Sequence, residues 1–239
     1  MCGRYRLARP DRIAEMRAAL KDFEEFTQLK LLPRFNTAPS QYLPIIRMNT
    51  AGHPHLDYVQ WGLIPHWTKG APKVRPINAK AETIATSGMF RKAFERRRCL
   101  IPADGFYEPK GPSPKRGEPS REQYFFHRKD DAVFAFAGLW ERWSPEPDVE
   151  PVDTFALITT SPNELVAPIH DRMPVILGPT DYERWLDRKV PGADVVDLLS
   201  RSATEGMERY RVDKTLLNTI DRRTRAPLDV PECSAAIDD

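Results

Sequence analysis

Hydrophobic residues occur along the chain mostly in short runs, a pattern that predicts a fold rich in β-strands. These runs cover residues 43–47, 56–63, 99–107, 124–127, 133–140, 155–160 and 173–177. Apolar runs of this length, bounded by proline, glycine or aspartate, are typical of strands in a buried sheet. The turn sequence Ala103-Asp104-Gly105 interrupts the third run, so the chain is expected to change direction there.

Helical spacing is confined to shorter segments. Apolar residues recur three or four positions apart after Pro10-Asp11, and residues 89–98 form a basic amphipathic pattern with Phe90 and Phe94 on one face. Similar patterns occur at residues 180–186 and 195–199. The 23 prolines favour many turns and short elements over long helices.

These patterns predict an α+β fold. The chain contains no internal repeat, and no linker is followed by a second set of core elements. We therefore expect a single domain built on a mostly antiparallel, barrel-like β-sheet with flanking short helices. The domain is expected to span residues 1–225. Residues 226–239, which include Cys233, have the composition of a poorly ordered C-terminal tail.

Composition narrows the class of protein without identifying it. The 239 residues are 41% hydrophobic and 29% charged with a net charge of +2, as in ordinary globular proteins. There is no secretory signal, and no apolar run reaches the roughly 18–20 residues needed to span a bilayer. The three cysteines have neither disulfide nor metal-ligand spacing. We expect a monomer in the reducing cytoplasm, with no metal, no cofactor and no membrane association.

The residue with the most distinctive chemistry is Cys2. The side chain after Met1 is small, so removal of the initiator methionine is expected, and Cys2 then carries a thiol and an α-amine on adjacent carbons. An α-amine has a pKa of about 7.7–8.0, so much of it is neutral at cellular pH. A neutral amine can attack an aldehyde to form an imine, and the thiol can then close a thiazolidine ring. Taken alone, Cys2 is equally an ordinary residue at a frayed terminus.

Eight short motifs change this assessment because they occur together in a fixed order. They are MCGRY at residues 1–5, FNTAP at 35–39, WGLIPHW at 61–67, NAKAET at 78–83, RCLIP at 98–102, GFYE at 105–108, AGLWE at 137–141 and HDRMPV at 170–175. In these motifs the chain resembles the SRAP (SOS response-associated peptidase) family, whose members shield abasic sites in single-stranded DNA. The resemblance extends from residue 2 to about residue 177.

The resemblance implies four catalytic positions: Cys2, Asn78, Glu108 and His170. A carboxylate and a histidine can supply a base and an acid near neutral pH, as imine formation and ring closure require. Glu108 is expected to exchange protons with the amine and the sugar oxygen, and His170 to protonate the opened sugar or hold the DNA backbone. Asn78 is suited to orienting the terminus or the sugar. Considered one by one, Glu108, His170 and Asn78 also fit ordinary surface, loop and turn positions.

A DNA-binding surface is expected beside these residues. Arg4 and Lys80 supply positive charge for phosphates, while Trp61 and Trp67 are candidates for stacking on bases. In the 35–39 motif, Pro39 is a candidate to wedge against a neighbouring base, and Asn36 is a further candidate DNA-binding residue. The sequence leaves open whether Trp61 lies in the groove or in the core, where large aromatic residues usually reside.

Two positions depart from the family pattern. Pro109 stands where many relatives have tryptophan after the motif glutamate, which removes one candidate stacking contact with DNA. Lys80 stands where the asparagine motif usually continues to arginine, and lysine lacks the bidentate guanidinium that suits phosphate. Neither departure affects the four catalytic positions.

Three functions remain open at this point. The first is covalent crosslinking to abasic sites in single-stranded DNA through Cys2, forming a thiazolidine that protects the lesion. The second is a thiol peptidase, or autopeptidase, that uses Cys2 with His170 and Glu108. The third is a non-covalent reader of single-stranded or modified DNA. The terminal position favours crosslinking, because an internal cysteine would serve a peptidase equally well but has no α-amine.

Overall fold

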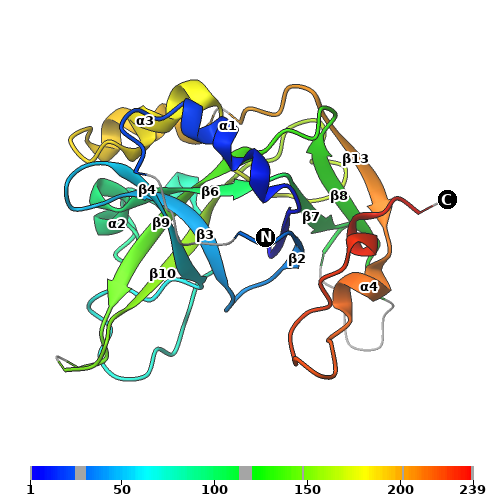
Figure 1. Ribbon diagram of the computed structural model, residues 1–239, viewed down its shortest axis with the longest axis horizontal. Coiled ribbons are helices and arrows are strands. Elements are labelled where there is room, and N and C mark those ends of the chain that lie inside the picture. Colours follow the sequence, from blue (N-terminus) through cyan, green and yellow to red (C-terminus); the bar gives the residue numbers. More distant parts are fainter. Residues whose placement is uncertain (1, 25–30, 113–119, 147, 201, 238–239) are drawn as a thin grey trace.

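Strands predominate in the computed structural model, which describes residues 2–24, 31–112, 120–146, 148–200 and 202–237 (Figure 1). The strands are β1 (Arg4–Leu7), β2 (Arg34–Thr37), β3 (Tyr42–Met48), β4 (Pro54–Trp61), β5 (Asn78–Lys80), β6 (Arg98–Ala103), β7 (Gly105–Pro109), β8 (Gln123–Arg128), β9 (Phe134–Trp143), β10 (Val152–Thr160), β11 (Met173–Pro174), β12 (Ile176–Leu177) and β13 (Met207–Val212). The α-helices are α1 (Ile13–Ala18), α2 (Arg91–Arg96), α3 (Tyr182–Leu186) and α4 (Lys214–Asn218). The 3₁₀ helices are η1 (Pro10–Arg12), η2 (Ala81–Thr83), η3 (Pro179–Asp181), η4 (Gly192–Leu199) and η5 (Pro231–Ser234).

Five strands of the larger sheet close into a barrel. Its strand order is β11-β10-β4-β3-β6-β9-β12, and β9 also pairs directly with β10. Thus β10, β4, β3, β6 and β9 form a ring in which only β4 and β10 are parallel neighbours. Side chains alternate along each strand, so every second residue points into the ring. Among these inward residues, Trp61, Phe136 and Phe155 belong to one hydrophobic core cluster.

The outer face of the barrel is covered by helices. Residues of α1, α2, α3 and η4 form a second core cluster with the outward residues of the barrel strands. The indole Nε1 of Trp185 on α3 donates a hydrogen bond to the carbonyl of Cys99 on β6, at 2.9 Å. Short helices suffice here because each needs to bury only one face against the sheet.

The smaller sheet has the order β13-β8-β7-β1-β2, so the N-terminal strand lies inside it. A single residue, Asp104, separates β6 from β7 and joins the two sheets. The fully buried carboxylate of Asp104 accepts hydrogen bonds from Arg6 Nε and from the backbone amides of Ala8 and Arg9, at 2.7 to 2.8 Å. These bonds attach the end of β1 to the corner between the sheets.

The C-terminal segment lies against the smaller sheet, beside α4 and β13 (Figure 1). Cys233 is fully buried, and Ala236 forms a β-bridge with Val212. Asp229 accepts hydrogen bonds from the backbone amides of Phe35 and Asn36, at 2.5 and 3.0 Å. Residues 226–237 thus have defined packing, in contrast to the poorly ordered tail expected from their composition. The physical reason is that β2 offers backbone donors that Asp229 in this segment satisfies. Residues 238–239 lie outside the described residues.

The architecture confirms the fold class predicted from the sequence. It is an α+β fold on a mostly antiparallel, barrel-like sheet with short flanking helices. Across the described residues, no helix is both long enough and apolar enough to cross a bilayer.

Candidate functional site

Pairing of β1 with β7 places Cys2 at the site. Arg4 lies opposite Tyr107 in antiparallel register, so the residues before Arg4 run alongside the residue after Tyr107, which is Glu108. Cys2 is fully buried, and its thiol lies 3.7 Å from the carbonyl oxygen of Arg4. Cys2 is therefore enclosed, in contrast to a residue at a frayed terminus.

Asn78 approaches Cys2 from the larger sheet. It begins β5, which runs parallel to β10 with Asn78 opposite Leu157. Its side-chain amide Nδ2 donates a 2.9 Å hydrogen bond to the backbone carbonyl of Cys2. The other amide atom, Oδ1, is buried and accepts no hydrogen bond from the part of the chain that the structure describes. The Nδ2 group of Asn78 thus holds the backbone of Cys2, and Oδ1 can accept a hydrogen bond from a further donor.

Glu108 is a buried carboxyl group on β7 with no exposed surface. Burial raises the pKa of Glu108 to about 8, because a carboxylate loses its hydration inside the protein. The positive charge of the chain's amino group opposes this shift. A carboxyl group with a pKa in this range exchanges protons readily near neutral pH, as acid–base catalysis requires.

His170 faces Glu108 across the site. Its Nε2 lies 3.9 Å from Glu108 Oε2, and its Nδ1 lies 3.0 Å both from the backbone amide of Arg172 and from Asp171 Oδ1. Nδ1 cannot accept a hydrogen bond from the Arg172 amide and at the same time donate one to Asp171. Burial lowers the pKa of His170, which favours the neutral ring, so we assign Nδ1 as the acceptor. The ring proton then resides on Nε2 and points toward Glu108.

The thiol of Cys2 has a strongly perturbed acidity. Burial raises its pKa well above the ordinary value, and the negative charge of Glu108 raises it further. At neutral pH the thiol is consequently protonated, so it is a weak nucleophile in this environment.

A cleft of about 820 Å³ opens at His170, while the buried Cys2 and Glu108 and the half-buried Asn78 do not line it. Its lining includes His170, Asp171, Pro109 and Arg121. Pro109, the position of one departure from the family pattern, thus lies at the edge of the cleft. Nothing in the sequence marked Arg121 as part of this site, since it stands in a polar stretch rich in proline and lysine.

Two of the predicted DNA contacts are corrected by their burial. Trp61 is fully buried between Tyr5 and Phe155, and its Nε1 donates to the carbonyl of Ile77 at 2.9 Å. Asn36 is also fully buried, and its Nδ2 donates to the carbonyls of Leu217 and Leu228. Neither side chain can reach a base, because inward-facing positions of a β-rich fold are taken by the core.

The remaining predicted DNA contacts differ in their exposure. The guanidinium of Arg4 is held by Asn36 Oδ1 at 2.7 Å and by the carbonyl of Leu217 at 2.6 Å, which assigns it a structural contact. Trp67 is 54% exposed on the loop after β4. Lys80 is exposed at the end of β5, and Pro39 is partly exposed after β2. These three positions remain accessible to a nucleic acid.

An ion pair beside His170 was not anticipated from the sequence. Arg172 donates to both carboxylate oxygens of Glu82, at 2.6 and 2.9 Å, and to the carbonyl of Thr159 at 2.6 Å. This bidentate pair fixes the loop that carries His170 against the end of β10. Both residues lie in the recognised motifs, but their separation of 90 positions gave no sign that they meet.

The described side chains form no cluster of three or more metal-ligating groups.

Comparison with known proteins places this arrangement in context. Residues 1–219 match the family model described as SOS response associated peptidase (SRAP). The abasic site processing protein YoqW of Bacillus subtilis (strain 168) is 39% identical over 224 residues, covering 92% of this chain and 95% of that protein. YoaM of the same organism, also named an abasic site processing protein, is 38% identical over 96% of this chain and 98% of its own.

Solved structures agree with these sequence matches. A crystal structure of a protein from Bacteroides thetaiotaomicron superimposes with a TM-score of 0.79 at 26% identity. The superposition covers 99% of this chain and all of that one.

Proposed function

Since this chain belongs to the SOS response associated peptidase (SRAP) family, we propose that it processes abasic sites in DNA through a covalent bond to Cys2. The lesion is an aldehyde in the open form of the sugar, and the proposed substrate is single-stranded DNA. The product is a thiazolidine that links the protein to the DNA and protects the lesion.

One observation carries this proposal: the enclosure of Cys2 together with three proton-handling and hydrogen-bonding groups. Asn78 holds the Cys2 carbonyl, and Glu108 and His170 lie within 3.9 Å of each other beside it. With Met1 removed, the α-amine of Cys2 becomes the new chain end at this point. The relatives that match most of this chain carry names that refer to abasic sites, which supports the same substrate.

The reaction begins at the amine, and the product contains all atoms of the protein and the DNA except those of one released water. The neutral amine adds to the aldehyde carbon, and loss of the carbonyl oxygen as water leaves an imine. The thiol then adds across the carbon–nitrogen double bond and transfers its proton to the nitrogen. The high pKa of the thiol supports this order, because a protonated thiol does not compete with the amine for the aldehyde.

Glu108 is the proton carrier in this scheme. Its carboxyl group, with a pKa of about 8, can take a proton from the Cys2 ammonium and return it to the departing oxygen. His170, with its proton on Nε2, donates toward Glu108 and toward the opened sugar. Asn78 Oδ1 is placed to accept a hydrogen bond from the amine or from a sugar hydroxyl.

A peptidase reaction has weaker support from the same geometry. A cysteine peptidase needs a thiolate stabilised by a positive neighbour, whereas burial and the Glu108 charge both raise the pKa of this thiol. The pKa of His170 is lowered, so His170 does not supply the missing positive charge.

The proposal is tested by incubating protein that lacks Met1 with a single-stranded oligonucleotide containing one abasic site. We expect an adduct that survives denaturing electrophoresis, with a mass equal to protein plus DNA minus one water. Cys2→Ala should abolish it. Cys99→Ala is the matched control, since Cys99 is equally buried and also has a raised thiol pKa but carries no α-amine.

The result that overturns the proposal is the absence of any adduct from protein shown by mass spectrometry to begin at Cys2. Turnover of peptides without DNA would then support the peptidase. Retained DNA affinity in Cys2→Ala, without any adduct from the parent protein, would support the non-covalent reader.

A further inference from the structure

The barrel interior changes from apolar to charged at the end remote from Cys2. At this end, β3 and β9 finish and β4, β6 and β10 begin. The residues here that point into the barrel are polar, apart from one tryptophan. They are Arg47, Asp57, Arg97, Trp140, Arg142 and Asp153. The Cys2 site lies at the other end, where β6 runs into β7 and β10 pairs with β5. The two ends of one barrel thus carry different chemistry.

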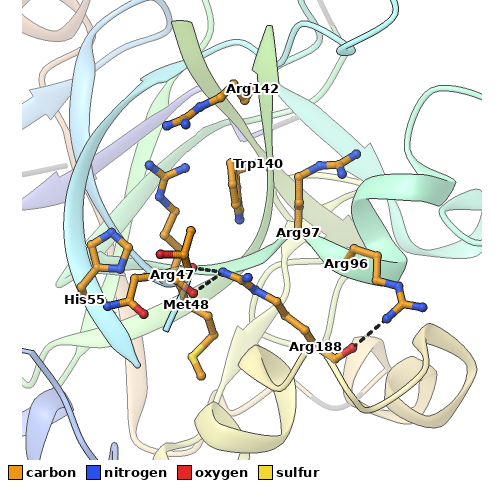
Figure 2. Close-up of a pocket in the computed structure, with 10 residues that line it drawn as sticks. Arg47, Met48, His55, Arg96, Arg97, Trp140, Arg142 and Arg188 are labelled. Carbon is orange, nitrogen blue, oxygen red and sulfur yellow. Dashed lines mark hydrogen bonds between the residues drawn. The ribbon is translucent and has the colours of Figure 1, made fainter. Parts of the chain in front are cut away.

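A cavity of about 530 Å³ lies at this charged end (Figure 2). We call it the arginine mouth, because its lining includes five arginines: Arg47, Arg96, Arg97, Arg142 and Arg188. Figure 2 shows the indole of Trp140 between the side chains of Arg47 and Arg97, with Arg188 reaching toward Met48.

Carboxylates neutralise only part of this charge. Asp153 binds Arg47 at 2.6 Å and Arg142 at 2.8 Å, and Asp57 also pairs with Arg47. Glu141 binds Arg97 at 2.6 Å. Burial alone would raise the pKa values of Asp57 and Asp153, but the hydrogen bonds and charges of His55 and the arginines outweigh it, so both carboxylates are ionised.

The remaining two arginines have no acidic partner in the described part of the chain. Arg188 donates to the backbone carbonyls of Met48 and Asn49, and Arg96 donates to the carbonyl of Arg188 at 3.5 Å. The arginine mouth therefore has an excess of two formal positive charges. Burial lowers the pKa of Arg188, and repulsion from Arg47 lowers it further, as expected for a cation without a counter-charge.

Buried donors in the arginine mouth are also left without acceptors. Arg47 is 5% exposed, and its Nε and Nη1 make no hydrogen bond to the described residues. The Nε of Arg97 is in the same condition. Buried donors without acceptors are rare, and these leave positive charge behind the cavity wall that an anion in the cavity would offset.

The shape of the arginine mouth indicates more than an anion. The cavity is larger than a single phosphate group requires, and a half-buried indole lines it. Arginine forks match phosphate oxygens, and an indole provides a flat surface for a nucleobase. Arg47 lies 4.1 Å from the centre of the Trp140 ring, a cation–π contact that occupies one face of the indole, so a base would stack against the other face.

We propose that the arginine mouth binds the phosphate monoester of a nucleotide, with the dianion between Arg96, Arg97 and Arg188 and the base against Trp140. The dianion matches the excess of two positive charges. Either a free mononucleotide or the phosphorylated end of a DNA strand presents this chemistry.

The test is calorimetric titration of the full chain at low salt with deoxyadenosine monophosphate. We expect saturable binding that is weakened about tenfold by Arg96→Gln, since one charge-assisted hydrogen bond contributes about this much. Arg96 is exposed on α2, so its replacement leaves the fold intact. Arg91→Gln is the matched control, because Arg91 is equally exposed on the same helix and does not line the arginine mouth.

Further ligands separate the parts of the proposal. Deoxyadenosine, which lacks the phosphate, should not bind, and inorganic phosphate should bind more weakly than the nucleotide. Equal affinity for inorganic phosphate would overturn the stacking on Trp140. A 5′-phosphorylated oligonucleotide that binds more tightly than both the mononucleotide and its unphosphorylated form would identify the DNA end as the source.

Two results would overturn the site itself. One is the absence of nucleotide binding at millimolar concentration, which would leave the arginines as a plug of ion pairs that closes the barrel. The other is equal weakening by Arg96→Gln and Arg91→Gln. Cys2→Ala should leave nucleotide binding unchanged, so this test and the crosslinking test fail independently.

Discussion

Glu108 shows how burial adjusts a single residue to its proposed task. A carboxyl group at the surface has a pKa near 4.5 and is ionised at neutral pH, whereas burial raises the pKa of Glu108 to about 8. The folded protein therefore holds a proton on Glu108 at neutral pH that the unfolded chain releases. This difference links the stability of the protein to pH.

The first prediction concerns that linkage. Because the pKa is raised in the folded state, the stabilising contribution of Glu108 is fully present below pH 4.5 and is lost as pH rises toward 8. Glu108→Gln keeps the size of the side chain and removes the titration. We expect its Tm to exceed that of the parent by roughly 5 °C at pH 8.5, with little difference at pH 5. Thermal melts at both pH values provide the measurement, and a constant Tm difference would contradict it.

The second prediction concerns the reaction of the same variant. Glutamine cannot accept or return a proton, so Glu108→Gln should slow adduct formation by about 10²–10⁴-fold, the usual contribution of general acid–base catalysis. The measurement is the initial rate of adduct formation with abasic DNA. Glu122→Gln is a suitable control, since the Glu122 side chain is 41% exposed and forms ion pairs with Lys110 and Arg211. An unchanged rate in Glu108→Gln would refute the assigned role.

Sequence reading located the four proposed catalytic residues because each stands in a short motif, yet it could not tell core from groove. From the same kind of evidence Asn36 was a candidate DNA contact and Trp61 was left open between groove and core, and both are fully buried. A motif records that a position is constrained, but not whether packing or binding constrains it. Only the pairing of β4 with β10 and of β1 with β2 decides which way those side chains face.

At the scale of elements, the position of Cys2 depends on β1 being fixed at its far end. The fully buried carboxylate of Asp104 binds the side chain of Arg6 in β1 and the backbone amides of Ala8 and Arg9 just beyond it. A shift of β1 along β7 by one residue would turn its side chains to the opposite face and move Cys2 away from Glu108.

The third prediction follows from this attachment. Asp104→Ala leaves the charge of Arg6 and two backbone amides without their acceptor, which should cost about 3–5 kcal/mol of stability. Adduct formation should slow at temperatures where the variant is still folded. Asp130→Ala removes an exposed partner of Arg128 and should cost no more than about 1 kcal/mol. Chemical denaturation of both variants measures the difference, and equal losses would contradict the assignment.

The fourth prediction concerns the close approach of β7 and β8. A Cβ atom added at Gly105 would lie 2.1 Å from Cζ of Phe125 and 2.9 Å from the carbonyl oxygen of Phe126. Gly105→Ala should therefore destabilise the protein by about 1–3 kcal/mol, as expected for overpacking. At Gly88 a Cβ atom would meet nothing within 4 Å, so Gly88→Ala should be neutral in the same denaturation experiment.

All five barrel strands overlap hydrophobic runs predicted from the sequence, while β1, β2, β5 and β13 outside the barrel were not predicted. The missed strands are short or carry many polar residues, as in the sequences RYRL and MERYRV. Their stability comes from partners distant in sequence, such as β13 on β8, and no local pattern reports such pairing. The helix expected at residues 89–98 is shorter in the structure, because Arg98 begins β6 and its guanidinium binds the carbonyls of Phe94 and Trp185.

At the scale of the whole molecule, the two ends of the chain meet in the smaller sheet. Arg4, two residues from Cys2, binds Asn36 and the carbonyl of Leu217, and Asn36 in turn binds the carbonyl of Leu228. The C-terminal segment thus supports the strands that position the N-terminus.

The fifth prediction is that removal of residues 226–239 destabilises the protein and slows adduct formation. Truncation removes Cys233 from the core cluster that it forms with Tyr107 and Phe125. It also removes Asp229, which accepts hydrogen bonds from the backbone amides of Phe35 and Asn36. We expect a loss of several kcal/mol, since two buried backbone donors become unsatisfied. Glu232→Gln, at an exposed position of the same segment, is the control and should leave both Tm and the rate unchanged.

The interior position of β1 in its sheet also sets the order of events during synthesis. The ribosome makes Cys2 first, but its neighbours on β7 emerge only after a hundred further residues, and Asp229 emerges last of all. At about 5–20 residues per second, the nascent terminus stays outside any fold for several seconds. If the reaction uses the free α-amine of Cys2, as proposed, Met1 has to be removed, and this interval is when the nascent terminus is accessible. On the proposed mechanism, a chain that folds with Met1 still attached would lack the free α-amine and form no adduct.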